Sequence, residues 1–236
     1  SAAGYVTLAA FAKCLLLTLK YHLSENEELI IQQLKKLFKD CDEKFRTGFI
    51  GTPILCHVLS DYGMSDLAYK LLLNEEYPGW LHEVKLGATT VWERWNSVLD
   101  DGSISGIGMN SLNHYAYGSV LEWIFAHGAG LKYMPESGGG RTLDIVPELN
   151  RELRELKAVY DSPLGVYRVH WQIIDAGHVR MSVQVPFGAQ AMLTLPYARP
   201  ETFDEKNNPM FAEVRDGKCC LTAGSYEVTY ETMEPL

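Results

Sequence analysis

The 236-residue sequence predicts an α+β chain of two domains, with helical hairpins over residues 1–130 followed by an antiparallel β-sandwich over residues 131–236. In the first region apolar residues recur at the spacing of amphipathic helices, whereas in the second they alternate with polar residues, as in half-buried strands. Short connections between the helical segments favour antiparallel hairpins stacked side by side. A glycine run, Gly138–Gly140, lies where one pattern gives way to the other.

The first two helices are expected near the N-terminus. Residues 2–22 form a long apolar segment with almost no turn residues, and it is too hydrophobic on all sides to face water. Ser24 and Glu27 then have the spacing of a capping box, which marks the start of a helix. Apolar residues from Ile30 to Phe38 follow at helical spacing, so this second helix is expected to bury one face.

The later helical segments are marked mainly by the residues at their ends. Thr52, followed by proline, predicts the cap of a helix that ends at Gly63, and Ser65 starts another helix. A short turn is expected over residues 80–85. An amphipathic helix over residues 115–127 is expected to end at the glycines that follow it.

Beyond the glycine run the period of the sequence changes to two. Short turn motifs at residues 162–165 and 175–177 separate the first segments of this part. The pattern predicts about seven short strands in an antiparallel sandwich, with no parallel sheet. They are expected over residues 156–160, 166–173, 179–185 and 191–195, near Val214, and over residues 218–222 and 225–232.

The composition argues against several classes of partner. With 21 Lys and Arg against 30 Asp and Glu, the net charge is −9, and no basic cluster is dense enough for nucleic acid or an anionic membrane. The five cysteines include no C-x-x-C pair, which favours a reduced, cytoplasmic setting. The apolar run from Val6 to Leu19 is too short to span a bilayer, and no basic segment precedes it, so we expect no signal peptide.

No cofactor or metal ion is expected. His82 and Glu83 resemble the start of a zinc-binding helix, but Leu86 stands where the second histidine would be. Gly106 and Gly108 lack both the preceding strand and the third glycine of a dinucleotide-binding loop. The sequence also has neither a P-loop nor the G-x-S-x-G elbow of serine hydrolases.

The densest polar and aromatic stretch is residues 87–95, in which Glu93 and Arg94 stand between Trp92 and Trp95. Burial between indoles raises the pKa of a carboxyl group and a neighbouring guanidinium lowers it, so Glu93 can stay ionised and act as a base near neutral pH. The residue pattern by itself favours a simpler interpretation. In that interpretation a buried Glu93–Arg94 ion pair holds a loop beneath two packed aromatic rings.

A second polar stretch, from Asn110 to His114, lies just ahead of a predicted helix. Its amide and imidazole groups suit the recognition of hydroxyl groups, although by themselves Asn110 is better explained as a helix cap and His114 as a core histidine. Asp100 and Asp101 offer a second carboxylate near Glu93. An Asp-Asp-Gly sequence is nevertheless more typical of a solvated turn.

Six stretches along the chain are distinctive together. They are Gly48-Phe-Ile-Gly-Thr-Pro53, Asp66-Leu-Ala-Tyr-Lys-Leu-Leu-Leu73, Tyr77-Pro-Gly-Trp80, Gly87-Ala-Thr-Thr-Val-Trp-Glu-Arg-Trp95, Gly108-Met-Asn-Ser-Leu-Asn-His-Tyr-Ala-Tyr-Gly118 and Tyr160-Asp-Ser-Pro-Leu-Gly165. In this order they resemble the C-terminal third of a bacterial α-L-rhamnosidase of glycoside hydrolase family 78, and the resemblance covers nearly the whole chain.

The resemblance implies an (α/α)6 toroid, of which this chain would hold about half, followed by a C-terminal β-sandwich. It also implies that terminal α-L-rhamnose is removed from rhamnose-containing glycosides with inversion, by a carboxylic acid and a carboxylate that activates water. On the matching motifs, Glu93 takes the place of the general base and His114 that of a sugar-contacting residue. Trp80 and Trp92 are expected to line the sugar pocket.

Two residues depart from the family pattern, since Asn96 and Leu112 stand where the family has Asp and Phe. The acidic motif that supplies the general acid lies upstream in the family and has no counterpart here. The chain is therefore interpreted as a fragment, nearly inactive by itself, whose exposed toroid face favours self-association. The alternatives are a non-catalytic carbohydrate-binding or assembly module, or a toroid that acts on another sugar.

Overall fold

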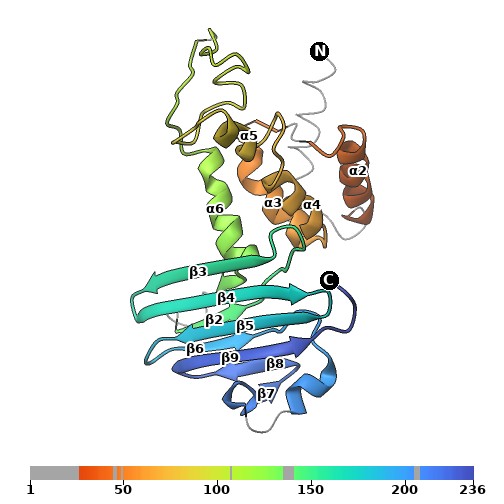
Figure 1. The fold of residues 1–236 in the computed structure, drawn as a ribbon, viewed down its shortest axis with the longest axis vertical. Coiled ribbons are helices and arrows are strands. Elements are labelled where there is room, and N and C mark those ends of the chain that lie inside the picture. Colours follow the sequence, from red (N-terminus) through yellow and green to blue (C-terminus); the bar gives the residue numbers. More distant parts are fainter. Residues whose placement is uncertain (1–26, 45–46, 49, 107, 135–140, 205–207) are drawn as a thin grey trace. The chain divides into compact units, whose positions relative to one another are not determined.

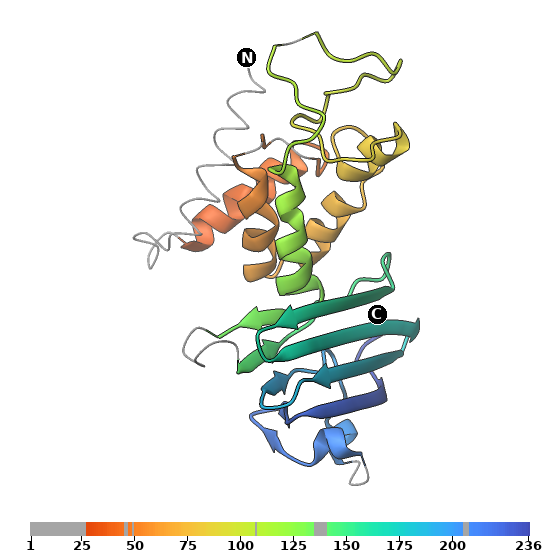
Figure 2. The ribbon, with the colours of Figure 1, turned by 90° about the vertical axis from the view of Figure 1, so that its left-hand side faces the viewer.

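The computed structural model describes residues 27–44, 47–48, 50–106, 108–134, 141–204 and 208–236. The chain forms two compact units, which are divided in sequence between Leu121 and Glu122. The first unit is helical and the second contains two β-sheets (Figures 1 and 2). The apolar helix expected over residues 2–22, and the Ser24 cap, lie outside the described residues.

The second predicted helix, which includes Ile30 to Phe38, is confirmed as α2, Glu27–Lys39. Its first turn carries Glu27 and Glu28 and its last turn carries Lys36 and Lys39. These charges oppose the partial charges at the two ends of the helix dipole and stabilise the helix. The buried face consists of Ile31, Leu34 and Phe38.

Helices α3 (Thr52–Asp61) and α4 (Ser65–Leu72) form the predicted hairpin, and they lie side by side in Figures 1 and 2. Gly51, rather than the expected Thr52, occupies the N-cap position of α3, while the Thr52 hydroxyl donates a hydrogen bond to Gly48 O at 2.9 Å. Gly63 ends the helix at φ +71°, a conformation that favours glycine.

Residues 80–85, expected as a turn, form the short helix α5, Trp80–Lys85. The Asn74 side chain shapes its entry, because Nδ2 donates a hydrogen bond to Pro78 O at 2.8 Å. A Cβ atom on Gly79 would lie only 2.8 Å from Asn74 O, so this entry requires a residue without a side chain. The turn thereby places Trp80 at the start of α5.

The helix expected over residues 115–127 is confirmed as a continuous helical stretch over residues 117–128, although it is not a uniform α-helix. It consists of a 3₁₀ turn η1 (Tyr117–Ser119), an α-helical turn α6 (Val120–Trp123) and a π-helical turn η2 (Ile124–Gly128). Near its start the Ser119 hydroxyl donates a hydrogen bond to Ala116 O at 2.6 Å. Such local bonds compete with regular helical pairing.

All seven predicted strands are confirmed, and two further strands, β1 and β2, precede them. One sheet has the order β1-β2-β6-β8-β7 and the other the order β3-β4-β5-β9, and Figure 1 shows β4, β5 and β9 in front of β6 and β8. The bounds are β1 Leu131–Tyr133, β2 Thr142–Ile145, β3 Glu155–Ser162, β4 Gly165–Asp175, β5 His178–Val185, β6 Gln190–Leu193, β7 Val214–Arg215, β8 Lys218–Leu221 and β9 Gly224–Glu231, with 3₁₀ turns η4 Pro200–Asp204 and η5 Pro209–Phe211.

One strand pair corrects the expectation of wholly antiparallel pairing, since β2 and β6 are parallel, with Thr142 opposite Gln190 and Ile145 opposite Leu193. The three strands between them, β3 to β5, belong to the other sheet. The chain therefore returns to the first sheet in its original direction without a crossover helix. Every other pair in the two sheets, among the strands described, is antiparallel.

The sandwich core lies between the two sheets and is filled by the alternate residues of their strands. Strand β4 shows the pattern clearly, because Tyr167, Val169, Trp171 and Ile173 are buried while the residues between them are more exposed. Trp171 is fully buried, and its indole N–H donates a hydrogen bond to Gly128 O at 2.8 Å. This bond satisfies a carbonyl group at the end of η2.

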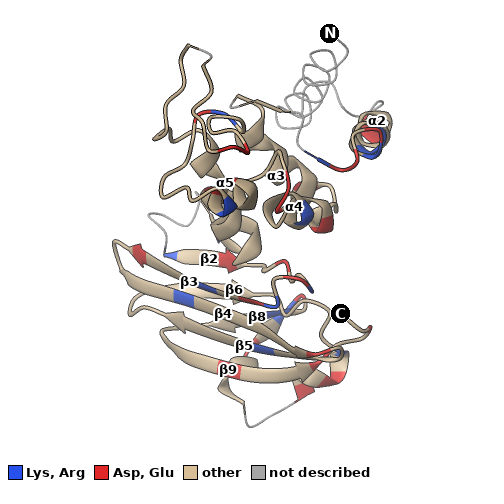
Figure 3. Cartoon of the chain, turned by 45° about the horizontal axis from the view of Figure 1, so that its top comes forward, with Lys and Arg blue, Asp and Glu red and all other residues tan. Residues whose placement is uncertain are grey.

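Acidic and basic residues are interspersed along the strands of the sandwich (Figure 3). One ion pair joins Lys218 on β8 to Asp144 on β2, with Nζ 2.8 Å from both carboxylate oxygens. Because β6 lies between these two strands, the pair reaches across β6 and ties three strands together.

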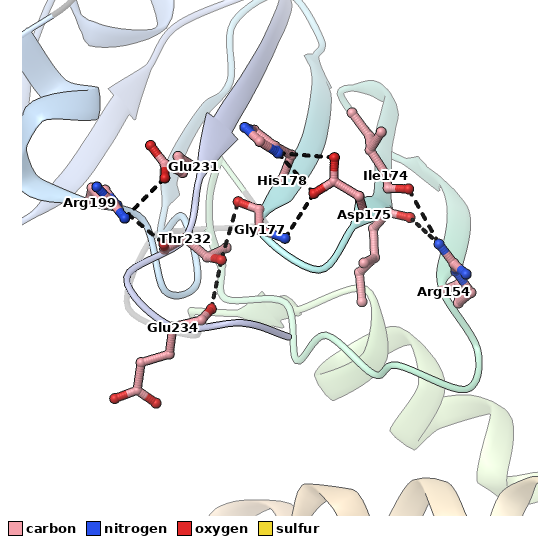
Figure 4. A network of polar contacts seen from close by, with 10 residues as sticks. Arg154, Ile174, Asp175, Gly177, His178, Arg199, Glu231, Thr232 and Glu234 are labelled. Carbon is pink, nitrogen blue, oxygen red and sulfur yellow. Dashed lines mark hydrogen bonds and ion pairs between the residues drawn. The ribbon is translucent and has the colours of Figure 1, made fainter.

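A polar network joins the β4–β5 turn to the end of the chain (Figure 4). Asp175 accepts hydrogen bonds from Gly177 N–H and from the His178 ring, both at 2.8 Å, and these bonds lower the pKa of Asp175. The Thr232 hydroxyl reaches Glu234 O at 2.7 Å, and Thr232 N–H donates to Gly177 O at 2.8 Å. The network closes one end of the β4–β5–β9 layer.

We expect Trp171→Ala to lower the free energy of unfolding of the sandwich by about 3–5 kcal/mol, because it removes a fully buried indole and leaves Gly128 O without its donor. Denaturant unfolding followed by near-ultraviolet circular dichroism would measure the change. Val159→Ala is the matched control, since Val159 is half exposed on the neighbouring strand β3. A loss of less than about 1 kcal/mol for Trp171→Ala would contradict this account of the core.

Candidate active site

The two polar motifs that the sequence singled out lie side by side in the helical unit. Glu93 N–H donates a hydrogen bond to Ser111 O at 2.9 Å, and Ser111 N–H donates in return to the Glu93 carboxylate oxygen Oε2 at 2.7 Å. His114 N–H bonds Val91 O at 2.8 Å. Residues 90–93 and 111–114 are therefore paired through their backbones, which places Glu93 and His114 on adjacent segments.

Glu93 is half-buried, and its carboxylate is oriented by the Ser111 backbone rather than by its neighbour Arg94. The Arg94 guanidinium instead donates a hydrogen bond to Gly108 O at 3.2 Å. The Glu93–Arg94 ion pair of the simpler interpretation is thus not formed in the described part of the chain. Both side chains nevertheless stabilise the approach of one motif to the other.

His114 is half-buried, and its Nδ1 atom accepts a hydrogen bond from Ala116 N–H at 3.2 Å. Because Nδ1 is the acceptor, a neutral imidazole carries its proton on Nε2 and can donate it to a hydroxyl group. The imidazole ring lies parallel to that of Tyr115, with centroids 5.3 Å apart, and Tyr115 is 86% exposed. The pair presents a polar and aromatic edge to solvent.

Behind these motifs lies a cluster of aromatic rings. Trp95 stacks on Tyr117 with centroids 3.9 Å apart and an interplanar angle of 9°, and Trp80 meets Trp95 edge-on at 5.4 Å. The Trp80 indole N–H donates to Tyr117 O at 3.0 Å, and the Trp95 indole N–H donates to Thr47 O at 3.3 Å. Burial raises the pKa of Tyr117. The cluster fixes α5 and η1 relative to residues 90–95.

Trp80 and Trp92, the expected pocket walls, are 9% and 4% exposed. Both rings are therefore largely covered within this chain. Trp80 lies in the first turn of α5, and Trp92 lies directly before Glu93. Large buried rings of this kind contribute strongly to packing.

The other polar candidates have structural explanations. Asn110 does not cap a helix, because the following helical stretch begins only at Tyr117. Its Nδ2 atom donates a hydrogen bond to Ser97 O at 3.0 Å. Asp101 accepts a hydrogen bond from Ser103 N–H at 2.9 Å, and the Ser103 hydroxyl and N–H lower the pKa of this exposed carboxyl group. The Asp-Asp-Gly sequence therefore forms the solvated turn that the sequence predicts.

A pocket of about 490 Å³ lies beside this turn, and Glu93 and His114 do not line it. The imidazole Nε2 of His82 lies 3.6 Å from the Asp100 carboxylate at its edge. No group of three His, Cys, Asp or Glu side chains within the described ranges could hold a metal ion. The pocket is lined by Tyr77, His82, Asn96, Val98, Leu99, Asp100 and Asp101.

Glu83, which in the sequence stands out only as part of an incomplete zinc motif, is a buried residue of α5. Its side chain is buried, with the residue only 3% exposed, and burial raises its pKa from an ordinary value of 4.5 to about 8, against the lowering effect of a hydrogen bond from the Trp92 backbone. Its second oxygen, Oε1, has no hydrogen-bond partner among the described residues. Glu83 follows the apolar Trp80 by three positions, which puts both side chains on one face of a short helix. This spacing could have indicated the burial of Glu83.

Comparison with known proteins identifies the family to which this fold and these motifs belong. Two family models match the chain, namely the bacterial alpha-L-rhamnosidase 6 hairpin glycosidase domain over residues 2–127 and the bacterial alpha-L-rhamnosidase C-terminal domain over residues 130–209. The chain belongs to the bacterial α-L-rhamnosidase family.

Named relatives agree with this assignment. An α-L-rhamnosidase of Formosa agariphila is 38% identical over 194 residues, which are 81% of this chain and 21% of that protein. One of Alteromonas sp. is 38% identical over 199 residues, 83% of this chain and 21% of that protein. The chain thus spans about a fifth of the length of these relatives.

Solved structures show the same fold. The α-L-rhamnosidase of Streptomyces avermitilis complexed with L-rhamnose matches with a TM-score of 0.81 and 32% identity, over 93% of this chain and 21% of that one. The native enzyme of Aspergillus terreus matches with a TM-score of 0.80 and 30% identity, over 94% of this chain and 24% of that one. Within the residues described here, no helix is both long enough and apolar enough to cross a membrane.

The buried Glu83 carboxyl group predicts a pH dependence of stability. Between about pH 4.5 and about pH 8 the folded chain holds a proton on Glu83 that the unfolded chain has lost, so the free energy of unfolding falls as the pH rises through this window. Glu83→Gln removes this contribution. We expect the stability of wild type relative to Glu83→Gln to be greatest below pH 4.5 and to decline until about pH 8.

Denaturant unfolding of both proteins from pH 4 to pH 9 would measure this difference. Histidines that titrate in the same range are common to both proteins and cancel in the comparison. Glu75→Gln is the matched control, because Glu75 is exposed and pairs only with Lys85 at the surface among the contacts described. Parallel stability curves for wild type and Glu83→Gln would show that Glu83 titrates normally.

Proposed function

We propose that this chain contributes the general base and part of the sugar site of an α-L-rhamnosidase, which removes terminal α-L-rhamnose from rhamnose-containing glycosides with inversion. One observation carries the proposal. The half-buried Glu93 carboxylate is oriented by Ser111 N–H at 2.7 Å, on a segment paired with the one that carries His114. A fixed carboxylate beside an imidazole donor is suited to activate water next to a bound hydroxylated ring.

In this proposal Glu93 removes a proton from the attacking water, and a hydrogen bond from His114 holds a sugar hydroxyl group. Ser111 N–H keeps the carboxylate in one orientation, so the water is activated on a single face of the sugar. Trp80 and Trp92 line or support the wall of the pocket. Residues 1–130 carry this catalytic part, and residues 131–236 form a C-terminal sandwich domain.

Inversion needs a second carboxyl group, an acid that protonates the leaving oxygen at about 6.5–9.5 Å from the base. We propose that this acid comes from polypeptide outside these 236 residues, in the remainder of the six-hairpin domain. The chain by itself is then nearly inactive. Its coverage of only about a fifth of the relatives supports this division.

A second candidate is a carbohydrate-binding or assembly module that has kept the fold without the chemistry. The lack of an acidic motif in the sequence favours it. In that case Glu93 serves only to tie residues 90–93 to residues 111–114, as its bond to Ser111 also allows. Self-association was expected partly from the apolar run of residues 6–19, which lies outside the described residues.

We expect Glu93→Gln, introduced into the complete six-hairpin domain that contains this chain, to lower kcat by about 10²–10⁴-fold. Substrate binding should persist, because the amide oxygen of glutamine can still accept the Ser111 N–H bond. Steady-state kinetics on an aryl α-L-rhamnoside, together with the melting temperature of the same sample, would measure both effects.

Glu76→Gln is the matched control for Glu93→Gln, since Glu76 is exposed and pairs with Lys44 away from the site. Its kcat should match that of wild type. A lower melting temperature with near-normal turnover for Glu93→Gln would instead support the structural role of the second candidate. Product analysis by nuclear magnetic resonance would test inversion, which predicts that the β anomer of rhamnose is released first.

A further inference from the structure

We infer that the outer face of the β-sandwich carries a binding site of its own, which takes a neutral saccharide. A pocket of about 280 Å³ lies on β4, β5 and β9, which are neighbours in one sheet (Figure 1). This volume is close to the lower limit for small-molecule sites, about 300 Å³. Five polar side chains line the pocket and form what we call the sheet-face cluster: Arg168, Ser182, Gln184, Ser225 and Glu227.

The strand register places the whole sheet-face cluster on one side of the sheet. On β5, Ser182 and Gln184 alternate with residues of the sandwich core. Gln184 lies opposite Arg168 on β4 and opposite Ser225 on β9. Ser182 lies opposite Glu227 on β9. Because residues directly opposite each other on antiparallel strands share a face, the cluster faces away from the core.

The hollow forms where a short side chain on the middle strand lies between long ones on its neighbours. Ser182 on β5 is half-buried, whereas Arg168 on β4 and Glu227 on β9 are exposed. Neighbouring strands are about 4.8 Å apart, so the backbones of β4 and β9 stand about 10 Å apart with β5 between them. The site is therefore a shallow pocket with a polar floor and one charged residue on each flanking strand.

The two charges of the cluster do not neutralise each other. Neither the Arg168 guanidinium nor the Glu227 carboxylate has a hydrogen bond or ion pair with another described residue. Charged residues beside them on the same face are paired, since Glu155 lies 2.9 Å from His170 and 2.8 Å from Lys157. The hydrogen-bonding groups of the pocket are thus open to a ligand from solvent.

The groups in the cluster suit a neutral ligand that is rich in hydroxyl groups. A guanidinium only donates hydrogen bonds, a carboxylate only accepts them, and amide and hydroxyl groups do both. The formal charges of Arg168 and Glu227 cancel, so neither a polyanion nor a polycation is favoured. Val183, the aliphatic residue of the lining, is only 2% exposed, which leaves no apolar wall for a peptide side chain. A saccharide matches this set, because each of its hydroxyl groups both donates and accepts.

A saccharide site on the sandwich would hold a glycoside on the same polypeptide that carries the proposed base, Glu93. Linked sites raise the effective concentration of a ligand that can engage both of them. The inference does not rest on the catalytic role of Glu93, since the sheet-face cluster belongs wholly to the second unit of the chain. Because the pocket is shallow and polar, we expect a Kd of about 1–10 mM.

Nuclear magnetic resonance of the 236-residue chain, titrated separately with methyl α-L-rhamnoside and with methyl β-D-glucoside, tests the inference at each residue. We expect at least one of these neutral glycosides to shift the backbone amides of Ser182, Gln184, Ser225 and Glu227 with a common Kd. Arg168→Ala and Gln184→Ala should each raise that Kd by about 10-fold, because each removes hydrogen bonds to the ligand.

Arg180→Ala is the matched control for Arg168→Ala. Arg180 is an exposed arginine on the same face of β5, and it does not line the pocket. Its substitution should leave the Kd unchanged. All three substituted side chains lie outside the sandwich core, so the melting temperatures should stay near that of wild type.

Three results would overturn the inference. The first is the absence of shifts in the sheet-face cluster with both glycosides at concentrations well above the expected Kd. The second is a shift of these amides by glycine, a zwitterion that can interact with both charges, without a shift by either glycoside. The third is an unchanged Kd in Arg168→Ala and Gln184→Ala.

The same titration separates this inference from the proposed function. Shifts confined to Glu93, His114 and their neighbours would support the proposed sugar site in the helical unit and refute the one on the sandwich. Shifts in the sheet-face cluster support the sandwich site, whatever the kcat of Glu93→Gln.

Discussion

The site depends on the reciprocal hydrogen bonds between Glu93 and Ser111. Glu93 N–H donates to Ser111 O, and the Glu93 carboxylate accepts Ser111 N–H at 2.7 Å. The same side chain thus closes the pairing of two segments and offers the carboxylate of the proposed chemistry. Any change at Glu93 acts on both properties, which is why rate and stability need to be measured on the same sample.

This pairing is supported from behind by the aromatic cluster and by α5. Trp95 lies flat on Tyr117 at 3.9 Å, and Trp80 is bonded to the Tyr117 carbonyl oxygen. A catalytic group gains from such rigid support, because little reorganisation is then required during the reaction.

Much of the fold was predictable because it depends on local spacing. Three local signals predicted most elements, because each depends on residues that are close together in the sequence. They are the periodic apolar residues of α2, the proline at the start of α3 and the alternating residues of seven strands. Strands β1 and β2 lie on either side of the glycine run and were not predicted. The helix expected over residues 115–127 runs over residues 117–128, so its position was predicted, whereas its 3₁₀ and π-helical turns were not.

The sequence by itself determined the two structural classes, the family and the motif that contains Glu93, because motifs and periodicity are properties of neighbouring residues. Tertiary structure alone decided that Arg94 bonds Gly108 O instead of Glu93, and that β2 pairs in parallel with β6. It also decided that Glu83 is buried, which raises the pKa of its carboxyl group to about 8. Each of these depends on which distant backbone groups reach a side chain and exclude water from it, and no local pattern carries that information.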